Sequence, residues 1–515
     1  MENTIKNLAM NYYSFWGNLT MYMLLIAATL YIYCYKWKTR KMDLMLKSFN
    51  KMPSLPLIGS TYLLFGNMRE RMIKLTNLVT DYKLPIAARM FYVPVVFIGS
   101  YEDIQIVMNK TYERASLGAF ERVFGGSVTL TQGEKWRKNR RVLSTAFSTT
   151  QLQQYLRIYN EYSALLLQQL EQFSDTDRTF EVEHYIANMN LDAITFNMTG
   201  YKLNMMEKTS TEFAEALHKA VALESMRFTI PVLFPEIIYT LYLFLSGNYK
   251  VFEIIHQLPR QIVKNKLAEY KKNRHLQNGN TDDTEKQPKT LLDTLLKNHE
   301  IDAEFTEEYM EAELLSTMIV GHDSISATVS FVLLMFAMNP EAQEKAYNEI
   351  KTVFGDDERP VQTEDMTKLI YLEQCMKETF RKFISTFFTL RKHDEDIILK
   401  DKQVIPAGCT ICVAFYAAHN DRRIFPNADK WDPEHFAADA IAGRDRLVSF
   451  IFGAGLRGCV GARYGMMAVK TELVHLVRRY RFTTEMKMDD IHLVMDFVPR
   501  NDSGFWLKAW SRRKR

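Results

Sequence analysis

The sequence predicts a mainly α-helical protein with a minor β portion, preceded by one N-terminal transmembrane helix. Apolar residues recur at helical spacing through most of the chain between residues 134 and 479, whereas alternating β-type runs are few and short. The 515 residues are 47% apolar and 24% charged, which is ordinary for a globular protein and excludes a disordered or collagen-like chain. A net charge of +4 excludes a strongly basic nucleic-acid-binding protein, so no nucleic acid is expected as a partner.

The first 50 residues predict a membrane anchor followed by a basic collar. All seventeen residues from Leu19 to Tyr35 are apolar, aromatic, Thr or Cys, and as a helix they would span about 26 Å, enough for a thin bilayer. Residues 36–51 then carry six basic residues and one acid, which places the rest of the chain in the cytoplasm. A cleaved signal peptide fits less well, because its charges would precede the apolar run. A buried core helix remains an alternative.

Residues 51–515 are expected to form a single domain. The prolines at 53 and 56 exclude a helix there and predict a stiff hinge behind the anchor. Pro85–Gly99 predicts strands. The expected helices cover 134–148, 151–173, 184–199, 209–227, 248–275, 306–338, 340–354, 368–383 and 459–479, with short strands at 395–415 and 481–510 and a surface loop at 275–289.

The apolar stretch Val232–Leu245 is too short to span a membrane, and Pro235 and Glu236 interrupt it. Burial in the core is the prediction for this stretch, and contact with a lipid surface is the alternative.

The five cysteines do not suggest a disulfide scaffold. Their number is odd and they are scattered, which favours a reducing compartment. Cys409 and Cys412 form a CxxC, but no second pair accompanies it and its neighbours predict a strand, so a structural role is expected.

Cys459 has different surroundings, because three glycines precede it at 453, 455 and 458 and Gly461 follows. Glycines at this density allow the backbone to lie close to a flat ligand. The expected helix start favours an anionic thiolate, which is a soft ligand suited to iron. Arg457 adds a cation beside it.

This segment resembles the heme-binding loop of the cytochrome P450 monooxygenases, in which Phe, Gly, Arg, Cys and Gly occur at the spacing of Phe452, Gly455, Arg457, Cys459 and Gly461. The resemblance implies the cytochrome P450 fold and a heme b (iron protoporphyrin IX) with Cys459 as its axial thiolate and metal ligand. It also implies that Phe452, Arg457 and Gly461 line the cofactor.

Further family motifs occur in the expected order. Glu378 and Arg381 resemble the ExxR pair, and His435 lies in a PERF-like segment where the family typically has Arg, which implies a structural triad of Glu378, Arg381 and His435. By the same resemblance, the residues expected at the heme propionates are Trp136 and Arg140 of a WxxxR pattern, Arg391 and Arg457.

The expected helix over 306–338 contains a segment that resembles the family's oxygen-activation motif. Oxygen cleavage needs protons at a buried site, and an acid beside a hydroxyl can relay them. The resemblance makes Asp323 the acid, Ser324 the hydroxyl and Gly321 the small residue that leaves room for dioxygen. Ser324 stands where Thr is typical, and it lacks the methyl group that would fix its rotamer. His322 is expected to be structural.

The Gly-His-Asp segment, residues 227–239 and residues 432–436 resemble the family-four clan, which includes fatty-acid hydroxylases and insect enzymes of hormone and xenobiotic metabolism. An insect-type microsomal member is expected. Some clan members attach the heme through a Glu ester where this chain has Val320, so a non-covalent heme is predicted. The prolines typical after Arg381 are missing from residues 382–387.

The function implied is insertion of one oxygen atom of O2 into a C–H bond of a small lipophilic substrate. Electrons would come from NADPH through NADPH–cytochrome P450 reductase, with cytochrome b5 as a further candidate partner. The expected location is the endoplasmic reticulum membrane, with the catalytic domain facing the cytoplasm. Two alternatives stay open: a heme-thiolate isomerase or dehydratase that needs no reductase, and a heme-binding sensor or carrier without catalysis.

Overall fold

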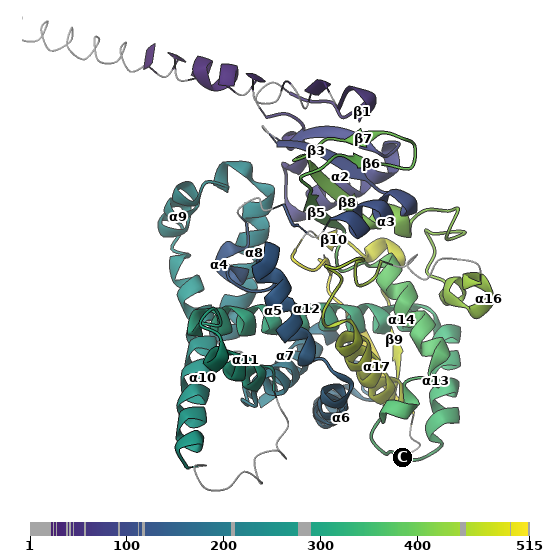
Figure 1. Ribbon diagram of the computed structural model, residues 1–515. Helices are drawn as coiled ribbons and strands as arrows, with labels where there is room; N and C mark the ends of the chain where they lie inside the picture. Colours follow the sequence, from purple (N-terminus) through teal and green to yellow (C-terminus); the bar gives the residue numbers. More distant parts are fainter. Residues whose placement is uncertain are drawn as a thin grey trace, which may run out of the picture.

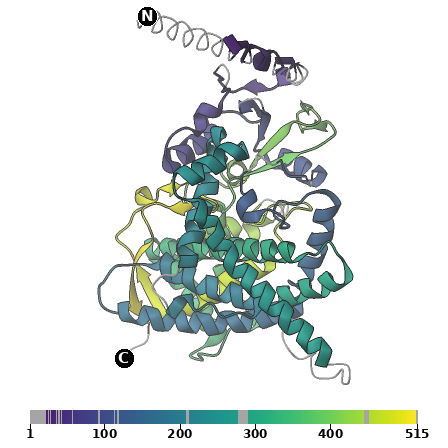
Figure 2. The ribbon, with the colours of Figure 1, turned by 90° about the vertical axis from the view of Figure 1, so that its left-hand side faces the viewer.

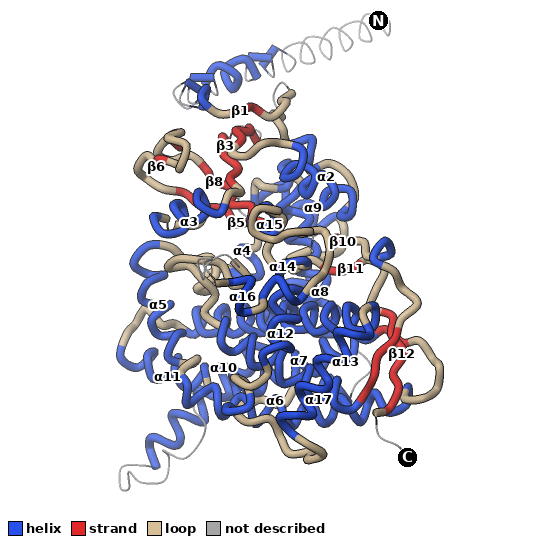
Figure 3. The backbone as a smooth tube through the Cα atoms, turned by 90° about the vertical axis from the view of Figure 1, so that its right-hand side faces the viewer, coloured by secondary structure: helices blue, strands red, loops and turns tan. Residues whose placement is uncertain are grey.

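The computed structural model describes residues 22–512, apart from 24, 27, 35, 38–39, 41–42, 45, 56–57, 91–92, 112, 116–118, 208–211, 277–289, 443–449 and 495. Helices form most of the molecule, and strands gather mainly at one end of it (Figures 1 and 3). The predicted fold class, mainly α with a minor β portion, is confirmed. The expected loop at 275–289 lies almost wholly outside the described residues.

The described helices follow the predicted ones closely. They are α2 (Met68–Asp81), α3 (Tyr101–Lys110), α4 (Glu121–Phe124), α5 (Gly133–Thr145), α6 (Thr149–Leu170), α7 (Val182–Thr199), α8 (Glu212–Thr229), α9 (Glu236–Leu245), α10 (Tyr249–Leu276), α11 (Leu291–Ile301), α12 (Glu307–Met338), α13 (Pro340–Phe354), α14 (Ile370–Lys382), α15 (Phe415–His419), α16 (Ala438–Ile441) and α17 (Ala462–Arg479). Helices α2, α3, α4, α9, α11, α15 and α16 lie outside the predicted helix ranges. Three of these, α2, α3 and α11, begin at a side-chain cap, provided by Asn67, Ser100 and Thr290.

The largest sheet joins distant parts of the chain in the order β1-β2-β3-β8-β5. Its strands are β1 (Asn50–Lys51), β2 (Ile86–Met90), β3 (Val93–Ile98), β8 (Thr410–Ala414) and β5 (Phe388–Lys392). Strand β3 pairs in parallel with β8, and Val95 lies opposite Thr410. The smaller sheets are β4-β12-β9 (Phe180–Glu181, Trp506–Ser511, Tyr480–Thr483), β10-β11 (Leu493–Val494, Arg500–Asn501) and β6-β7 (Ile397–Ile398, Val404–Ile405).

The two cysteines of the CxxC lie in the largest sheet. Cys412 is buried in β8, and Cys409 is buried just before that strand begins. The described residues contain no cluster of His, Cys, Asp and Glu that could hold a metal ion.

Helix α12 is the core of the molecule. Among the described residues it is the one helix long and apolar enough to cross a membrane, but 83% of its apolar window is buried inside the protein. It packs against α7, α10, α14 and α17, which surround it in Figure 1. A helix that is apolar on all sides is typical of a buried position. The fold therefore holds Asp323 and Ser324 near the middle of this largely buried helix.

The predicted anchor, Leu19–Tyr35, lies partly outside the described residues. Its described members, in the ranges 22–23, 25–26 and 28–34, are helical and exposed, and in Figure 2 this purple segment lies at one end of the molecule. The expected hinge lies against the sheet: Met52 and Ser60 donate to the carbonyls of Ala87 and Arg89 in β2. The sheet edge therefore holds this segment.

The prediction that the core buries Val232–Leu245 is wrong for most side chains of this stretch. Residues 236–245 form α9, of which only Tyr239 and Leu243 are buried. Ile237 is 85% exposed and Phe244 is 73% exposed. The two buried residues are four apart and share one helix face, so the opposite apolar face of α9 points outward.

Candidate functional site

The segment 450–461 forms a tight loop that leads into α17. Cys459 donates its backbone N–H to the carbonyl of Phe452 at 2.8 Å, and Gly458 donates to Gly455 at 3.0 Å. Gly455 has a φ of +64°, and a Cβ there would lie 2.1 Å from the carbonyl oxygen of Met108 at the end of α3. Only glycine fits this close backbone contact. The ring of Phe452 packs 5.5 Å from that of Phe380 on α14.

Helix α17 begins at Ala462, with Gly461 as its N-cap residue, so the helix starts three residues later than predicted. Cys459 therefore precedes the helix, and the backbone N–H of Gly461 is a hydrogen-bond donor to its sulfur. Desolvation raises the pKa of the Cys459 thiol, while the Gly461 N–H and the guanidinium groups of Arg140 and Arg114 act in the opposite direction. The thiol side chain retains contact with solvent, as a ligand to an external group requires.

Four arginines from different parts of the fold lie close to one another in or near this loop. Arg457 donates to the carbonyl of Thr131 at 2.7 Å and lies 4.0 Å above the ring of Trp136, which is buried on α5. Arg140 lies one turn further along α5, and Arg391 lies on β5. The structure therefore brings together the residues predicted to contact the heme propionates.

Arg114 is the fourth arginine, and sequence reasoning missed it. It donates to the carbonyl of Thr129 at 2.8 Å, and its Nε has no hydrogen-bond partner among the described residues. It follows α3 in an irregular segment without a motif of its own. Its proximity to Arg140, Arg391 and Cys459 depends on long-range packing, and no local sequence signal could have revealed it.

Three arginines of this cluster lack a negatively charged partner among the described residues. Arg114, Arg140 and Arg391 make no ion pair with a described carboxylate. Burial together with the charges of Arg114 and Arg457 lowers the pKa of Arg391 to about 9, and its buried Nε has no hydrogen-bond partner among the residues that the structure describes. Buried cations are costly unless an anion pairs with them, so the site has the chemistry to receive carboxylate groups of a ligand.

The residues around Cys459 thus fit a heme. The sulfur can ligate iron, and the arginine cluster can pair with the two propionate groups.

The predicted triad is assembled from two residues of α14 and His435. Arg381 forms a two-pronged ion pair with Glu378 at 2.7 and 2.8 Å, and both side chains are fully buried. Arg381 also donates to the carbonyls of His419 and Lys430, and the backbone N–H of Asp432 donates to Glu378. Every charge of this pair is therefore satisfied, and two carbonyls and one amide from residues 419–432 are fixed to α14.

His435 completes the triad through both of its ring nitrogens. Nδ1 lies 3.1 Å from the Glu378 carboxylate, and Nε2 lies 2.5 Å from the carbonyl oxygen of Pro426. Two acceptors require two N–H donors, which only the protonated imidazole has. The hydrogen bond to Glu378 raises the pKa of His435 above its ordinary value.

We expect this histidine to make stability depend on pH. Because its folded pKa is raised, its contribution is complete below pH 6.5 and is lost as the pH rises through the folded value. His435→Arg should remove that loss, because Arg stays protonated. The free energy of unfolding measured in urea at pH 9 should therefore be roughly 1–3 kcal/mol higher for the variant than for the wild type. At pH 6 the two proteins should have similar free energies of unfolding.

His492→Arg is the matched control, because His492 is partly exposed and lies outside the triad. A wild-type stability that does not fall between pH 6 and pH 9, or that falls equally in His435→Arg, would contradict a protonated His435.

The predicted proton-relay residues lie on α12. Ser324 donates its hydroxyl to the carbonyl of Val320 at 2.8 Å. Asp323 is buried and forms an ion pair with Arg500 of β11. Gly321 faces α7, since a Cβ there would lie 2.8 Å from the Ile194 side chain. Its small size therefore allows α12 and α7 to pack closely, and its role in leaving room for dioxygen stays a prediction.

Comparison with known proteins identifies the family. The model of the family described as "Cytochrome P450" matches residues 51–503. Similar proteins include cytochrome P450 4c21 of Blattella germanica, which is 29% identical over 88% of this chain and 91% of its own length. Cytochrome P450 4V2 of Homo sapiens is 27% identical over 89% and 88%, and cytochrome P450 4g15 of Drosophila melanogaster is 23% identical over 96% and 97%. The relatives thus belong to P450 family four and include insect proteins, as predicted.

The family match spans most of the chain, including every motif residue described above, and its members carry heme b on a cysteine thiolate. The chain therefore belongs to the cytochrome P450 family, the oxidoreductases that act as heme-thiolate monooxygenases.

Proposed function

We propose that this chain is a membrane-bound monooxygenase that inserts one atom of O2 into a C–H bond of a small lipophilic substrate, such as a fatty acid, a hormone or a xenobiotic. Residues 51–515 would form its single catalytic domain. Electrons would come from NADPH through NADPH–cytochrome P450 reductase, with cytochrome b5 as an additional donor. The observation that carries this proposal is the thiol of Cys459 in a glycine-rich loop, close to Arg114, Arg140 and Arg391, which make no ion pair with a carboxylate of the described residues.

In this proposal each residue has a separate task. Cys459 holds the iron, and the heme when bound supplies the activation of O2 and the oxidation of the C–H bond. Arg114, Arg140, Arg391 and Arg457 hold the propionates, and Trp136 supports Arg457 through its ring. Asp323 and Ser324 deliver protons from α12. The protein thus fixes the cofactor and supplies the protons.

Two measurements on the full chain test this function. The reduced protein with carbon monoxide should show the strongly red-shifted Soret band of thiolate ligation. With NADPH and reductase it should then consume oxygen, which an isomerase, a dehydratase or a heme carrier has no need to do. A red-shifted band without reductase-dependent oxygen consumption would favour those alternatives.

We expect the heme to be held without a covalent bond. Val320 lies one residue before Gly321 on α12, and its side chain has no group that can form an ester. Acidic organic extraction should therefore release all of the porphyrin from the wild type, as followed by absorbance in the two phases. Val320→Glu is the matched variant, because it restores a carboxyl at that position. Porphyrin that stays with the wild-type protein would contradict the prediction.

A location on the endoplasmic reticulum membrane is part of the proposal. The described residues of the anchor are helical and exposed, and the outward face of α9 presents large apolar side chains at Ile237, Leu241, Phe244 and Leu245. Exposed apolar surface of this size is typical of a membrane or protein contact. In Figure 1, α9 and the N-terminal segment lie at the same end of the molecule, so both could reach one lipid surface.

Photoreactive lipids can test the contact of α9 with a membrane. In vesicles whose acyl chains carry a photoreactive group, the full-length protein should be cross-linked within residues 236–245. Ile301 at the end of α11 is 84% exposed and serves as an internal control, because exposure alone would label it as well. Equal labelling of the two sites, or none on α9, would contradict the proposed contact.

A further inference from the structure

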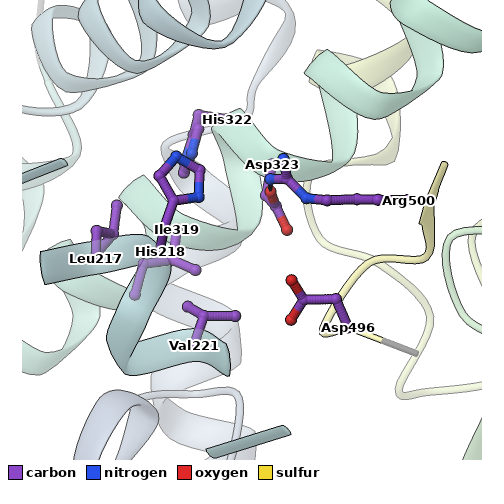
Figure 4. A pocket seen from close by; sticks show the side chains of 8 residues that line it. All are labelled: Leu217, His218, Val221, Ile319, His322, Asp323, Asp496 and Arg500. Atoms are coloured by element: carbon purple, nitrogen blue, oxygen red, sulfur yellow. Dashed lines mark hydrogen bonds and ion pairs between the residues drawn. The ribbon is translucent and has the colours of Figure 1, made fainter. Parts of the chain in front are cut away.

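Asp323 belongs to a buried charge cluster built from three distant segments. Arg500 donates from one nitrogen to Asp323 and from the other to Glu183, the latter at 3.0 Å. Asp496 lies across from Asp323, as Figure 4 shows. Its Oδ1 accepts from the hydroxyl of Ser225 at 3.1 Å and from the backbone N–H of Phe497 at 2.7 Å. Three carboxyl groups thus surround a single guanidinium.

The charges of this cluster do not balance if every carboxyl is ionised. Burial raises the pKa of Glu183 to about 7, and burial together with the charge of Asp323 raises the pKa of Asp496. Glu181 stands next to the cluster and adds further negative charge. Since the guanidinium of Arg500 cannot lose its proton, a proton on one of the carboxyls would relieve the surplus of negative charge. The raised pKa values of Glu183 and Asp496 therefore favour protonation of this cluster.

A small polar cavity separates Asp496 from Asp323. It measures about 10 Å³ and is lined also by His218, His322 and Arg500 (Figure 4). This is close to the space that one water molecule needs, and the lining offers more than the two polar partners that such a water requires. A single water could therefore connect the two carboxyl groups.

The two histidines are neutral lining groups. Burial lowers the pKa of His218 to about 4 and also lowers the pKa of His322. His322 lies 2.9 Å through Nδ1 from the carbonyl oxygen of Met318. Its Nδ1 must donate there, so its Nε2 is an acceptor. Neither ring adds a positive charge, and Arg500 remains the cation of the cluster.

We propose that Asp496, Glu183 and Arg500 form a proton-loading cluster, in which Asp496 passes a stored proton across the cavity to Asp323 and Arg500 is the positioning residue. This inference rests on the proposed use of Asp323 in proton delivery. In the transfer an O–H bond of Asp496 breaks and one forms on Asp323, while the cavity water accepts one proton and gives up another. Asp323 is only 4% exposed, whereas Asp496 and Glu183 keep partial contact with solvent and can be reprotonated from it.

The test uses three variants of the full-length holoenzyme. Asp496→Asn keeps the shape of the side chain but cannot give up a proton. Arg500→Lys keeps the positive charge but cannot bridge Asp323 and Glu183 with a planar fork. Asp489→Asn is the matched control, because Asp489 is exposed and lies outside the cluster. All three should keep the carbon monoxide spectrum of the wild type.

Infrared difference spectroscopy measures the stored proton without any turnover. On titration through neutral pH in H2O and D2O, the wild type and Asp489→Asn should lose the carbonyl band of a protonated carboxyl. Asp496→Asn should lack this titration or show it at a shifted pH, and Arg500→Lys should shift it as well.

The second readout is the share of consumed O2 that appears as hydrogen peroxide with NADPH and reductase. Proton transfer by a positioned group contributes about 10²–10⁴ in rate, so Asp496→Asn should raise the ratio of peroxide to water about tenfold or more. In the wild type this ratio should rise with pH above neutrality, and in Asp496→Asn it should not depend on pH. Arg500→Lys should give an intermediate ratio.

Two failures are distinguishable. A wild type that consumes no oxygen with reductase would overturn the proposed function and the delivery step with it. A wild type that consumes oxygen, while Asp496→Asn matches Asp489→Asn in both the infrared titration and the peroxide ratio, would overturn the proton-loading cluster alone.

Discussion

Replacing Cys459 by alanine is expected to abolish the red-shifted Soret band of the reduced protein with carbon monoxide, together with all reductase-dependent oxygen consumption. The variant removes the one sulfur at the end of the loop that Gly453, Gly455 and Gly458 shape. Electron donation from an axial thiolate is what favours cleavage of the O–O bond. The loop should persist, because the hydrogen bond from residue 459 to Phe452 uses only the backbone.

Cys412→Ala is the matched control, because Cys412 is buried in β8 away from the loop. It should keep the band and the oxygen consumption. A red-shifted band that survives in Cys459→Ala, or that is lost only in Cys412→Ala, would show that the ligand has been assigned to the wrong cysteine.

Arg381→Met is expected to destabilise the protein by about 3–5 kcal/mol, the cost of leaving a buried charge without its partner. The variant would remove the two-pronged partner of the fully buried Glu378 carboxylate and leave it only His435 and the Asp432 N–H, and the carbonyls of His419 and Lys430 would lose their donor. Urea unfolding followed by circular dichroism measures the loss. Heme should also dissociate more readily, since α14 carries Phe380 against the Cys459 loop.

The same helix provides the control. Lys377 pairs with Glu373 at 2.7 Å, one turn apart and half-exposed. Such surface pairs contribute about 0.3–0.5 kcal/mol, so Lys377→Met should change the free energy of unfolding by no more than that. An equal decrease in the free energy of unfolding in Arg381→Met and Lys377→Met would contradict a special role for the buried triad.

The sequence predicts the long helices well, because each presents a continuous apolar stripe. It fails where tertiary surroundings decide the outcome. Residues 232–245 are apolar enough for a core, yet α9 turns its apolar residues outward. The glycine pattern predicts that α17 starts at Cys459. Residues 459–461 belong to the tight loop instead, and the helix starts at Ala462. Local pattern gives the element, and packing sets its bounds and its exposed face.

The site residues also fall into two groups, those that a local motif identifies and those that only long-range packing brings to the site. Cys459, Glu378 and Arg381 lie in motifs with fixed spacing and could be named from the chain alone. Arg114 and Arg500 lie in irregular or short β segments without a motif, and they reach the site across the fold. Arg500 is 177 residues from Asp323 along the chain, so no local periodicity could connect the two. The pairing of His435 with both Glu378 and Pro426 likewise depends on a loop geometry that the sequence does not reveal.

The order of strands in the largest sheet has a consequence for biosynthesis. Val95 in β3 pairs with Thr410 in β8, so the inner edge of β3 has no partner until more than 300 further residues have been made. At ~5–20 residues per second this takes ~15–60 s. Throughout that time an apolar strand edge next to the membrane-proximal segment can pair with other chains. Newly made chains should therefore depend on chaperones at this edge, and a ribosome-bound chain that ends before residue 410 should aggregate more readily than one that includes β8 and β5.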